Sequence, residues 1–140
     1  MKSVVRAIVG VVLGLFVALV LVIAVEFFSD QVHPLPQDFD GTMEAMCRHV
    51  EKYPAWVLAV VVPAWAITAY VGTWVARKIG TRGSAAVVGL LLVLAVAFNV
   101  SKLPYPFWFK GSCQVSIPFA CLAAVLWSSR PAISVSSEPA

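Results

Sequence analysis

The chain has 140 residues, of which 61% are hydrophobic and 12% are charged, and its mean hydropathy is +0.91. Soluble domains are close to half apolar and a quarter charged, so this composition excludes an ordinary water-soluble globule. The small net charge of +3 arises from basic residues placed between apolar runs. This placement is typical of the loops of a membrane protein, and we expect no nucleic-acid partner.

Four continuous apolar runs predict four membrane-spanning helices. Each run is close to the length that crosses a hydrocarbon core about 30 Å thick at a helical rise of about 1.5 Å per residue. The runs are also much longer than the alternating strands of a membrane barrel. The predicted fold class is therefore an all-α four-transmembrane-helix bundle over residues 1–128, with helices at about 4–28, 55–76, 84–100 and 106–127. Residues 129–140 are predicted to form a disordered cytoplasmic tail, because they are rich in Ser, Pro and Ala.

The first run resembles a secretory signal at its start, where Lys2 and Arg6 precede the apolar residues. It is longer than the usual apolar region of a signal, and the segment Glu26-Phe27-Phe28 at its end lacks the small residues of a cleavage site. We therefore expect it to be retained as the first helix.

Lysine and arginine residues predict the orientation of the bundle. Cytoplasmic loops of membrane proteins carry an excess of these residues. One side of the predicted bundle has six of them and the other side has four: Lys2, Arg6, Arg77, Lys78, Arg82 and Arg130 against Arg48, Lys52, Lys102 and Lys110. We expect a multi-pass protein of the inner (plasma) membrane with both termini in the cytoplasm.

The first connection is predicted to be extracytoplasmic and to contain a short amphipathic helix over about residues 41–52. Its apolar residues recur at helical spacing, and either Asp40 or Thr42 is available as an N-cap. Such a helix is expected to lie at the membrane surface or to cover the bundle with its apolar face down. That apolar face would consist of Met43, Met46, Cys47 and Val50.

Small residues recur at four-residue spacing on the first two spans. Gly10, Gly14 and Ala18 form one row, and a second row on the next span includes Gly72 and Ala76. Because lipid leaves little hydrophobic force between helices, such rows favour close backbone packing. We expect them to pack the helices of one chain together; a homodimer through Gly10 and Gly14 is the alternative.

Polar residues near the predicted outer half of the bundle form a candidate site. Ionisable groups at membrane depth are costly and are often paired or functional. The candidate polar site consists of Glu26, His33, Asn99, Lys102, Lys110 and Gln114.

Two interpretations of this site remain open. In one, Glu26 and Gln114 line a path for a small substrate or a proton. In the other, Glu26 lies at the headgroup boundary, solvated or paired with Lys102 or Lys110, and the two amides form hydrogen bonds between helices.

Motifs for catalysis, cofactors or metals are absent from the sequence. It lacks a Gly-rich phosphate loop, HExxH, CxxC and G-x-S-x-G, and the spacing of His33 and His49 matches no recognised metal pattern. We predict no cofactor and no metal. The three cysteines, Cys47, Cys113 and Cys121, are predicted to be free thiols.

Glu26, the pair His33-Pro34, the short outer helix, Asn99 and the segment 104–108 (PYPFW) together resemble a group of small bacterial four-span membrane proteins that have no assigned activity. The resemblance covers the spans and the first loop, and it implies an inner-membrane setting. The leading functional hypothesis is a non-enzymatic accessory or structural component that contacts the lipid bilayer and either self-associates or joins a membrane complex. The alternative is a small transporter or channel subunit that uses the candidate polar site; an enzyme is the least supported class.

Overall fold

The computed structural model describes residues 1–127, and the tail predicted over 129–140 lies outside the described residues. Within 1–127 the chain forms five helices and no strand. Four of the helices are long and apolar enough to cross a membrane, which confirms the predicted all-α four-helix bundle of a multi-pass membrane protein. The helices are α1 (Lys2–Val32), α2 (Met43–Glu51), α3 (Ala55–Ile79), α4 (Arg82–Lys102) and α5 (Phe107–Trp127).

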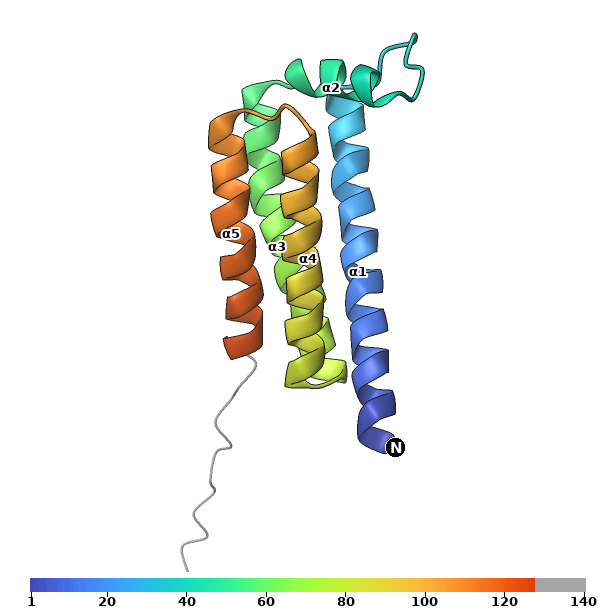
Figure 1. Cartoon of the computed structure of the whole chain (residues 1–140), viewed down its shortest axis with the longest axis vertical. Helices are drawn as coiled ribbons and strands as arrows, with labels where there is room; N and C mark the ends of the chain where they lie inside the picture. The colour runs from blue at the N-terminus through green and yellow to red at the C-terminus, as the bar shows by residue number, and fades with distance from the viewer. Residues whose placement is uncertain (128–140) are drawn as a thin grey trace, which may run out of the picture.

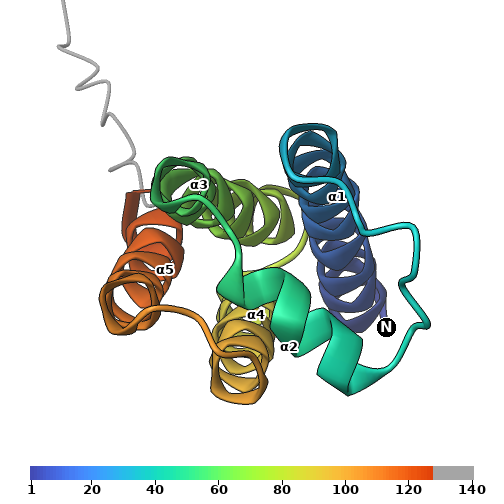
Figure 2. The same ribbon diagram turned by 90° about the horizontal axis from the view of Figure 1, so that it is seen from above.

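The spanning helices run side by side, and α2 lies across one end of them (Figures 1 and 2). We call this end the α2 end and the other the turn end, because the short α3–α4 connection lies there. Helix α3 packs against the three other spanning helices, whereas α1 contacts α3 and α4 and does not touch α5. Helices α1, α3 and α4 extend past the predicted apolar runs, because polar and charged residues continue them at their ends.

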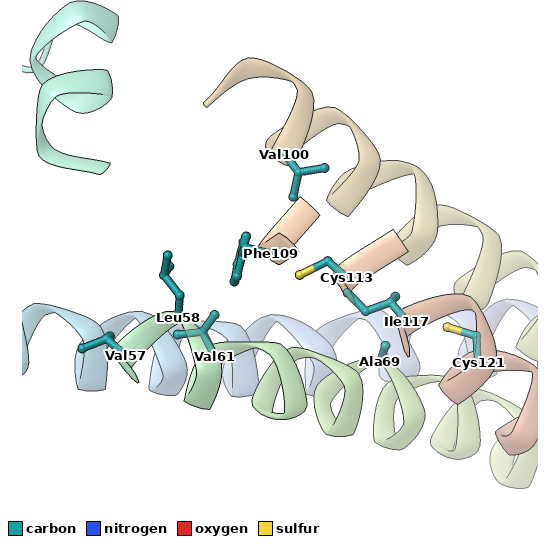
Figure 3. Close-up of a cluster of buried hydrophobic side chains, with 9 residues drawn as sticks. All are labelled: Val57, Leu58, Val61, Ala69, Val100, Phe109, Cys113, Ile117 and Cys121. Carbon is teal, nitrogen blue, oxygen red and sulfur yellow. The ribbon is translucent and has the colours of Figure 1, made fainter. Parts of the chain in front are cut away.

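The apolar core lies mainly between α3 and α5 (Figure 3). Phe109 and Leu58 are the largest fully buried side chains, and Val100 joins them from α4. Cys113 and Cys121 are buried in the same cluster, Cys47 on α2 is partly exposed, and all three thiols are free, as predicted. The opposite faces of the helices carry exposed large apolar side chains, as expected where helices meet lipid.

The small-residue rows pack α1 against α3 within the chain. A Cβ atom added to Gly14 would lie 2.7 Å from the Cβ of Ala76 and 2.8 Å from the carbonyl oxygen of Gly72. A Cβ added to Gly72 would lie 2.8 Å from that of Ala18. The two backbones are therefore in direct contact, and Gly10 and Gly14 are covered by α3 within the chain.

The α3–α4 turn is fastened to the start of α1. Thr81 and Ser84 form a capping box at the N-terminus of α4, and Ser84 Oγ also donates to the carbonyl oxygen of Ala7 at 2.9 Å. A Cβ on Gly10 would come within 2.4 Å of the Cα of Gly80. Gly80 has φ −93° and ψ −127°, so its lack of a side chain serves this close approach and not a left-handed turn.

Helix α2 begins where the sequence indicates, and its buried face matches the predicted one in part: Val50 is buried, and Met46 and Cys47 are partly buried. Of the two candidate caps, Thr42 is the N-cap, since its side chain accepts a hydrogen bond from the N–H of Ala45. Asp40 supports this cap by accepting from the N–H and hydroxyl groups of Thr42 at 2.9 and 2.7 Å. Met43, predicted on the apolar face, is exposed, and the buried residues of α2 are Ala45, His49 and Val50.

Candidate functional site

Glu26 and Asn99, two members of the candidate polar site, line the same hollow. It has a volume of about 190 Å³ and lies between α1, α3 and α4. Both residues lie near the α2-end termini of their helices, whereas Trp65 and Thr68 line the hollow from further down α3. The remaining wall is apolar and comes from Val22, Ala69, Leu92, Ala95 and Val96.

Two polar atoms of residues that line this hollow are buried without a hydrogen-bond partner. They are the indole Nε1 of Trp65 and the amide Oδ1 of Asn99. A buried polar atom with no partner costs about 1–3 kcal/mol, and such atoms are rare in folded proteins. Because Trp65 and Asn99 line the same hollow, these atoms mark a polar region beside its otherwise apolar wall.

Glu26 lines the same hollow, is exposed, and forms no ion pair. In residues 1–127 the only salt bridge joins Arg48 and Glu44, at 2.8 Å on the exposed side of α2. The ammonium group of Lys102 lies over the ring of Phe98, 5.5 Å from its centroid, and the Lys102 side chain is exposed. The pairing of Glu26 with Lys102 or Lys110, considered from the sequence, is therefore not formed.

A second hollow shares one wall residue, Glu26, with the first. It has a volume of about 430 Å³ and lies beneath α2. Glu26 is the one residue that lines both hollows. The other polar residues of the second hollow are Asp30, His33, His49 and Tyr53.

His33, His49 and Tyr53 form an aromatic cluster that fixes α2 above α1. The two imidazole rings are stacked with their centroids 4.5 Å apart and an angle of 18° between their planes. The Tyr53 ring lies 4.7 Å from His33 and 5.3 Å from His49, and its hydroxyl forms a hydrogen bond with buried Ser29. Burial raises the pKa of Tyr53, and the charge of Glu26 raises it further.

The histidine stack is expected to weaken as the pH falls. Burial lowers the pKa of His49 from its usual 6.5, and the nearby His33 and Lys52 lower it further, against the opposing charge of Asp30. As the pH falls, a histidine in undocked α2 therefore takes up a proton before His49 in docked α2 does. Docking of α2 is thus favoured at neutral pH, and its free energy becomes less favourable below about pH 6.5.

We expect hydrogen exchange in residues 43–51 to accelerate between pH 7 and pH 5.5, after correction for the intrinsic pH dependence of exchange. His49→Phe keeps an aromatic ring and removes the titration, so it should abolish most of this acceleration. Equal acceleration in the variant would contradict this assignment.

The other expected site residues lie elsewhere. Gln114 is exposed on α5, a helix that does not touch α1, so Glu26 and Gln114 do not line one path. Lys110 is a partly buried residue in the first turn of α5, and neither it nor Lys102 contributes to the two hollows. His33 contributes to the second hollow only.

The residues that complete the site carry little signal in the amino-acid sequence. Trp65 lies about ten residues into α3, at about 15 Å along the helix, away from the interface where tryptophan is usual in membrane proteins. That depth is a usable signal for a polar role. His49 and Tyr53 are brought to His33 only by the path of the first connection.

The arrangement offers hydrogen-bond acceptors and negative charge at membrane depth. In residues 1–127 no group of three or more His, Cys, Asp or Glu side chains could hold a metal ion. Glu26, Asn99 and Trp65 place a carboxylate, an amide and an indole in the wall of the first hollow. Comparisons with protein-family models, with curated proteins and with solved structures find no match to this chain.

Proposed function

We propose that this protein is a non-enzymatic accessory component of the membrane that holds a ligand in the hollow at Glu26. The observation that carries this proposal is the place of Glu26 in the walls of both hollows. A ligand that enters beneath α2 reaches Glu26 first and then the unpaired atoms of Asn99 and Trp65. Pockets with apolar walls and a few converging polar groups are typical ligand sites.

Close packing at the turn end favours binding over conduction. Gly10 lies against Gly80, Gly14 lies against Gly72 and Ala76, and Ser84 is hydrogen-bonded to the first turns of α1. These contacts leave no room for a side chain between α1 and α3, so the proposed ligand would enter and leave at the α2 end.

The proposal includes the orientation and the membrane. We place the protein in the inner membrane of a bacterium, with both termini in the cytoplasm and the α2 end outside, because basic residues flank the turn end. The resemblance to small bacterial four-span proteins supports the same setting.

Labelling of Cys47 tests this orientation. Cys47 is partly exposed on α2, whereas Cys113 and Cys121 are buried in α5, so a membrane-impermeant maleimide added to intact cells with a permeable outer barrier should label Cys47 alone. Cys47→Ser is the control and should remove the label. Labelling that requires lysis of the inner membrane would place the α2 end in the cytoplasm.

A small transporter is the second candidate, and the presence of Glu26 in the walls of both hollows favours it. In a transporter, a carboxylate can serve one compartment and then the other. This function would require α1 to separate from α3 and α4 at the turn end, where the glycine contacts and the Ser84 hydrogen bond now hold them together.

Two measurements on the purified protein test the proposed function. Native mass spectrometry in mild detergent should show a stoichiometric bound mass that is lost in Glu26→Gln and retained in Glu51→Gln, which removes an exposed carboxylate of α2. Liposomes containing the protein should conduct protons and potassium no faster than empty liposomes. Flux that depends on Glu26 would instead support the transporter.

A further inference from the structure

Glu26 is the only charged residue that lines the first hollow, so the hollow carries negative charge when this carboxyl is ionised. Glu26 contributes a carboxylate and Asn99 contributes an unpaired amide oxygen, whereas the only unpaired donor is the indole N–H of Trp65. Asp30 lies one helical turn beyond Glu26 and adds a second carboxylate beside the entrance under α2. Two carboxylates along one route attract cations and repel anions.

None of the lysine and arginine residues in the described part of the chain pairs with Glu26. Its carboxylate has no ion pair in residues 1–127, and Lys102 lies over Phe98. Glu26 is exposed near the α2 end of α1. A carboxylate at the edge of a membrane that lacks a partner gains from a ligand of opposite charge, because attraction between charges is stronger where water is scarce. Trp65 adds to this preference, since indole is the aromatic ring that attracts cations most strongly.

The rest of the hollow determines the shape of the ligand. Apart from Glu26, Trp65, Thr68 and Asn99, the wall is aliphatic, so the body of the ligand should be apolar. The volume of about 190 Å³ is below the roughly 300–1,000 Å³ of sites for drug-sized molecules. The site therefore suits a compact molecule, such as one aromatic ring with a short side chain.

A metal ion fits these residues poorly. Metal sites need several oxygen, nitrogen or sulfur ligands around one point, and no such group exists among the described residues. A primary ammonium group has three N–H donors, which can be shared between the Glu26 carboxylate and the Asn99 amide oxygen. An organic ammonium ion therefore matches the site better than a metal does.

We propose that the hollow between α1, α3 and α4 binds a primary ammonium ion with a compact apolar body, with Glu26 as its counter-ion and Asn99 as a second acceptor. This inference rests on the proposed binding function and specifies its ligand class. The ammonium group lies between Glu26 and Asn99 beside the Trp65 ring, and the apolar body lies against Val22, Leu92 and Val96.

Three probes of similar size and different charge test the ligand class. They are 2-phenylethylamine, 2-phenylethanol and 3-phenylpropionate, with binding measured at pH 7 on the full chain in phosphatidylcholine nanodiscs, after subtraction of binding to empty nanodiscs. The amine should bind at least 10-fold more tightly than the alcohol, and the carboxylate should not bind.

Variants locate the binding in the hollow. Glu26→Gln keeps the shape of the side chain and should reduce the affinity for the amine to that for the alcohol. Asn99→Leu should weaken amine binding several-fold, because it removes one acceptor. Glu51→Gln removes an exposed carboxylate from α2 and should leave the affinity unchanged.

Equal affinities for amine and alcohol, an unchanged preference in Glu26→Gln, or no binding of any probe would overturn the proposed ligand class. Tighter binding of 3-phenylpropionate or 2-phenylethanol would also overturn it, although the protein would still be a binding protein. The proposed function has a different test from the ligand class. It fails if native mass spectrometry finds no Glu26-dependent ligand and liposomes show Glu26-dependent flux.

Discussion

Replacement of Gly14 by leucine is expected to separate α1 from α3 and to lower the free energy of unfolding substantially. Even a Cβ atom at this position would lie 2.7 Å from the Cβ of Ala76 and 2.8 Å from the carbonyl oxygen of Gly72. Both neighbours are backbone or directly attached to backbone, so neither can move without shifting a helix. Overpacking of a tight interface costs about 1–3 kcal/mol and occasionally more, and we expect at least the upper value here.

The measurement is the free energy of unfolding in mixed micelles titrated with a denaturing detergent. Gly111→Leu is the matched control, because Gly111 lies on a spanning helix and a Cβ there would meet no atom within 4 Å. We expect the control to unfold like the parent protein. Similar losses in the two variants would mean that leucine acts through helix propensity and not through the contact between α1 and α3.

The same substitution should also impair ligand binding. Helix α1 carries Glu26 and is held only by α3 and α4 among the spanning helices. When the contact at Gly14 is forced apart, the wall that Glu26 contributes moves away from Asn99 and Trp65. The stability of the α1–α3 contact and the proposed site are thus coupled.

Replacement of Phe109 by alanine is expected to lower the free energy of unfolding by about 3 kcal/mol, the lower end of the range for Phe→Ala changes in cores. The Phe109 side chain is fully buried, and its ring contacts those of Trp65, Tyr105 and Trp108 at centroid distances of 5.7, 4.6 and 6.0 Å. The lower end applies because the unfolded helices remain in lipid, so the loss comes from packing and the cavity more than from transfer out of water.

Phe119→Ala is the control for this prediction. Phe119 lies on the same helix and is 74% exposed, so its ring contacts lipid in both the folded and the unfolded state. We expect a loss below about 0.5 kcal/mol, the usual range for a surface change. If Phe119→Ala were as destabilising as Phe109→Ala, the assignment of these two faces of α5 to lipid and core would be wrong.

The sequence alone determined the spanning helices and their small-residue contacts. A continuous apolar run long enough to cross lipid has few alternatives to a helix, because every backbone polar group must be paired within the membrane. The rows at Gly10, Gly14 and Gly72 were interpretable for a similar reason, since residues four positions apart lie on one face of a helix. The N-cap of α2 was narrowed to Asp40 or Thr42 because capping depends on a few consecutive residues.

Only the tertiary structure decided which polar residues meet. Depth in the membrane follows from position along a helix, and on that basis Glu26, Asn99 and Gln114 all belong to the same half of the bundle. The direction in which each side chain faces depends on the rotation of its helix and on the neighbouring helices. In the folded chain Gln114 faces outward, whereas Asn99 lines one hollow with Glu26 and Trp65. Apolar side chains nearly all round a spanning helix give no strong preference for one rotation, so packing between helices makes that choice.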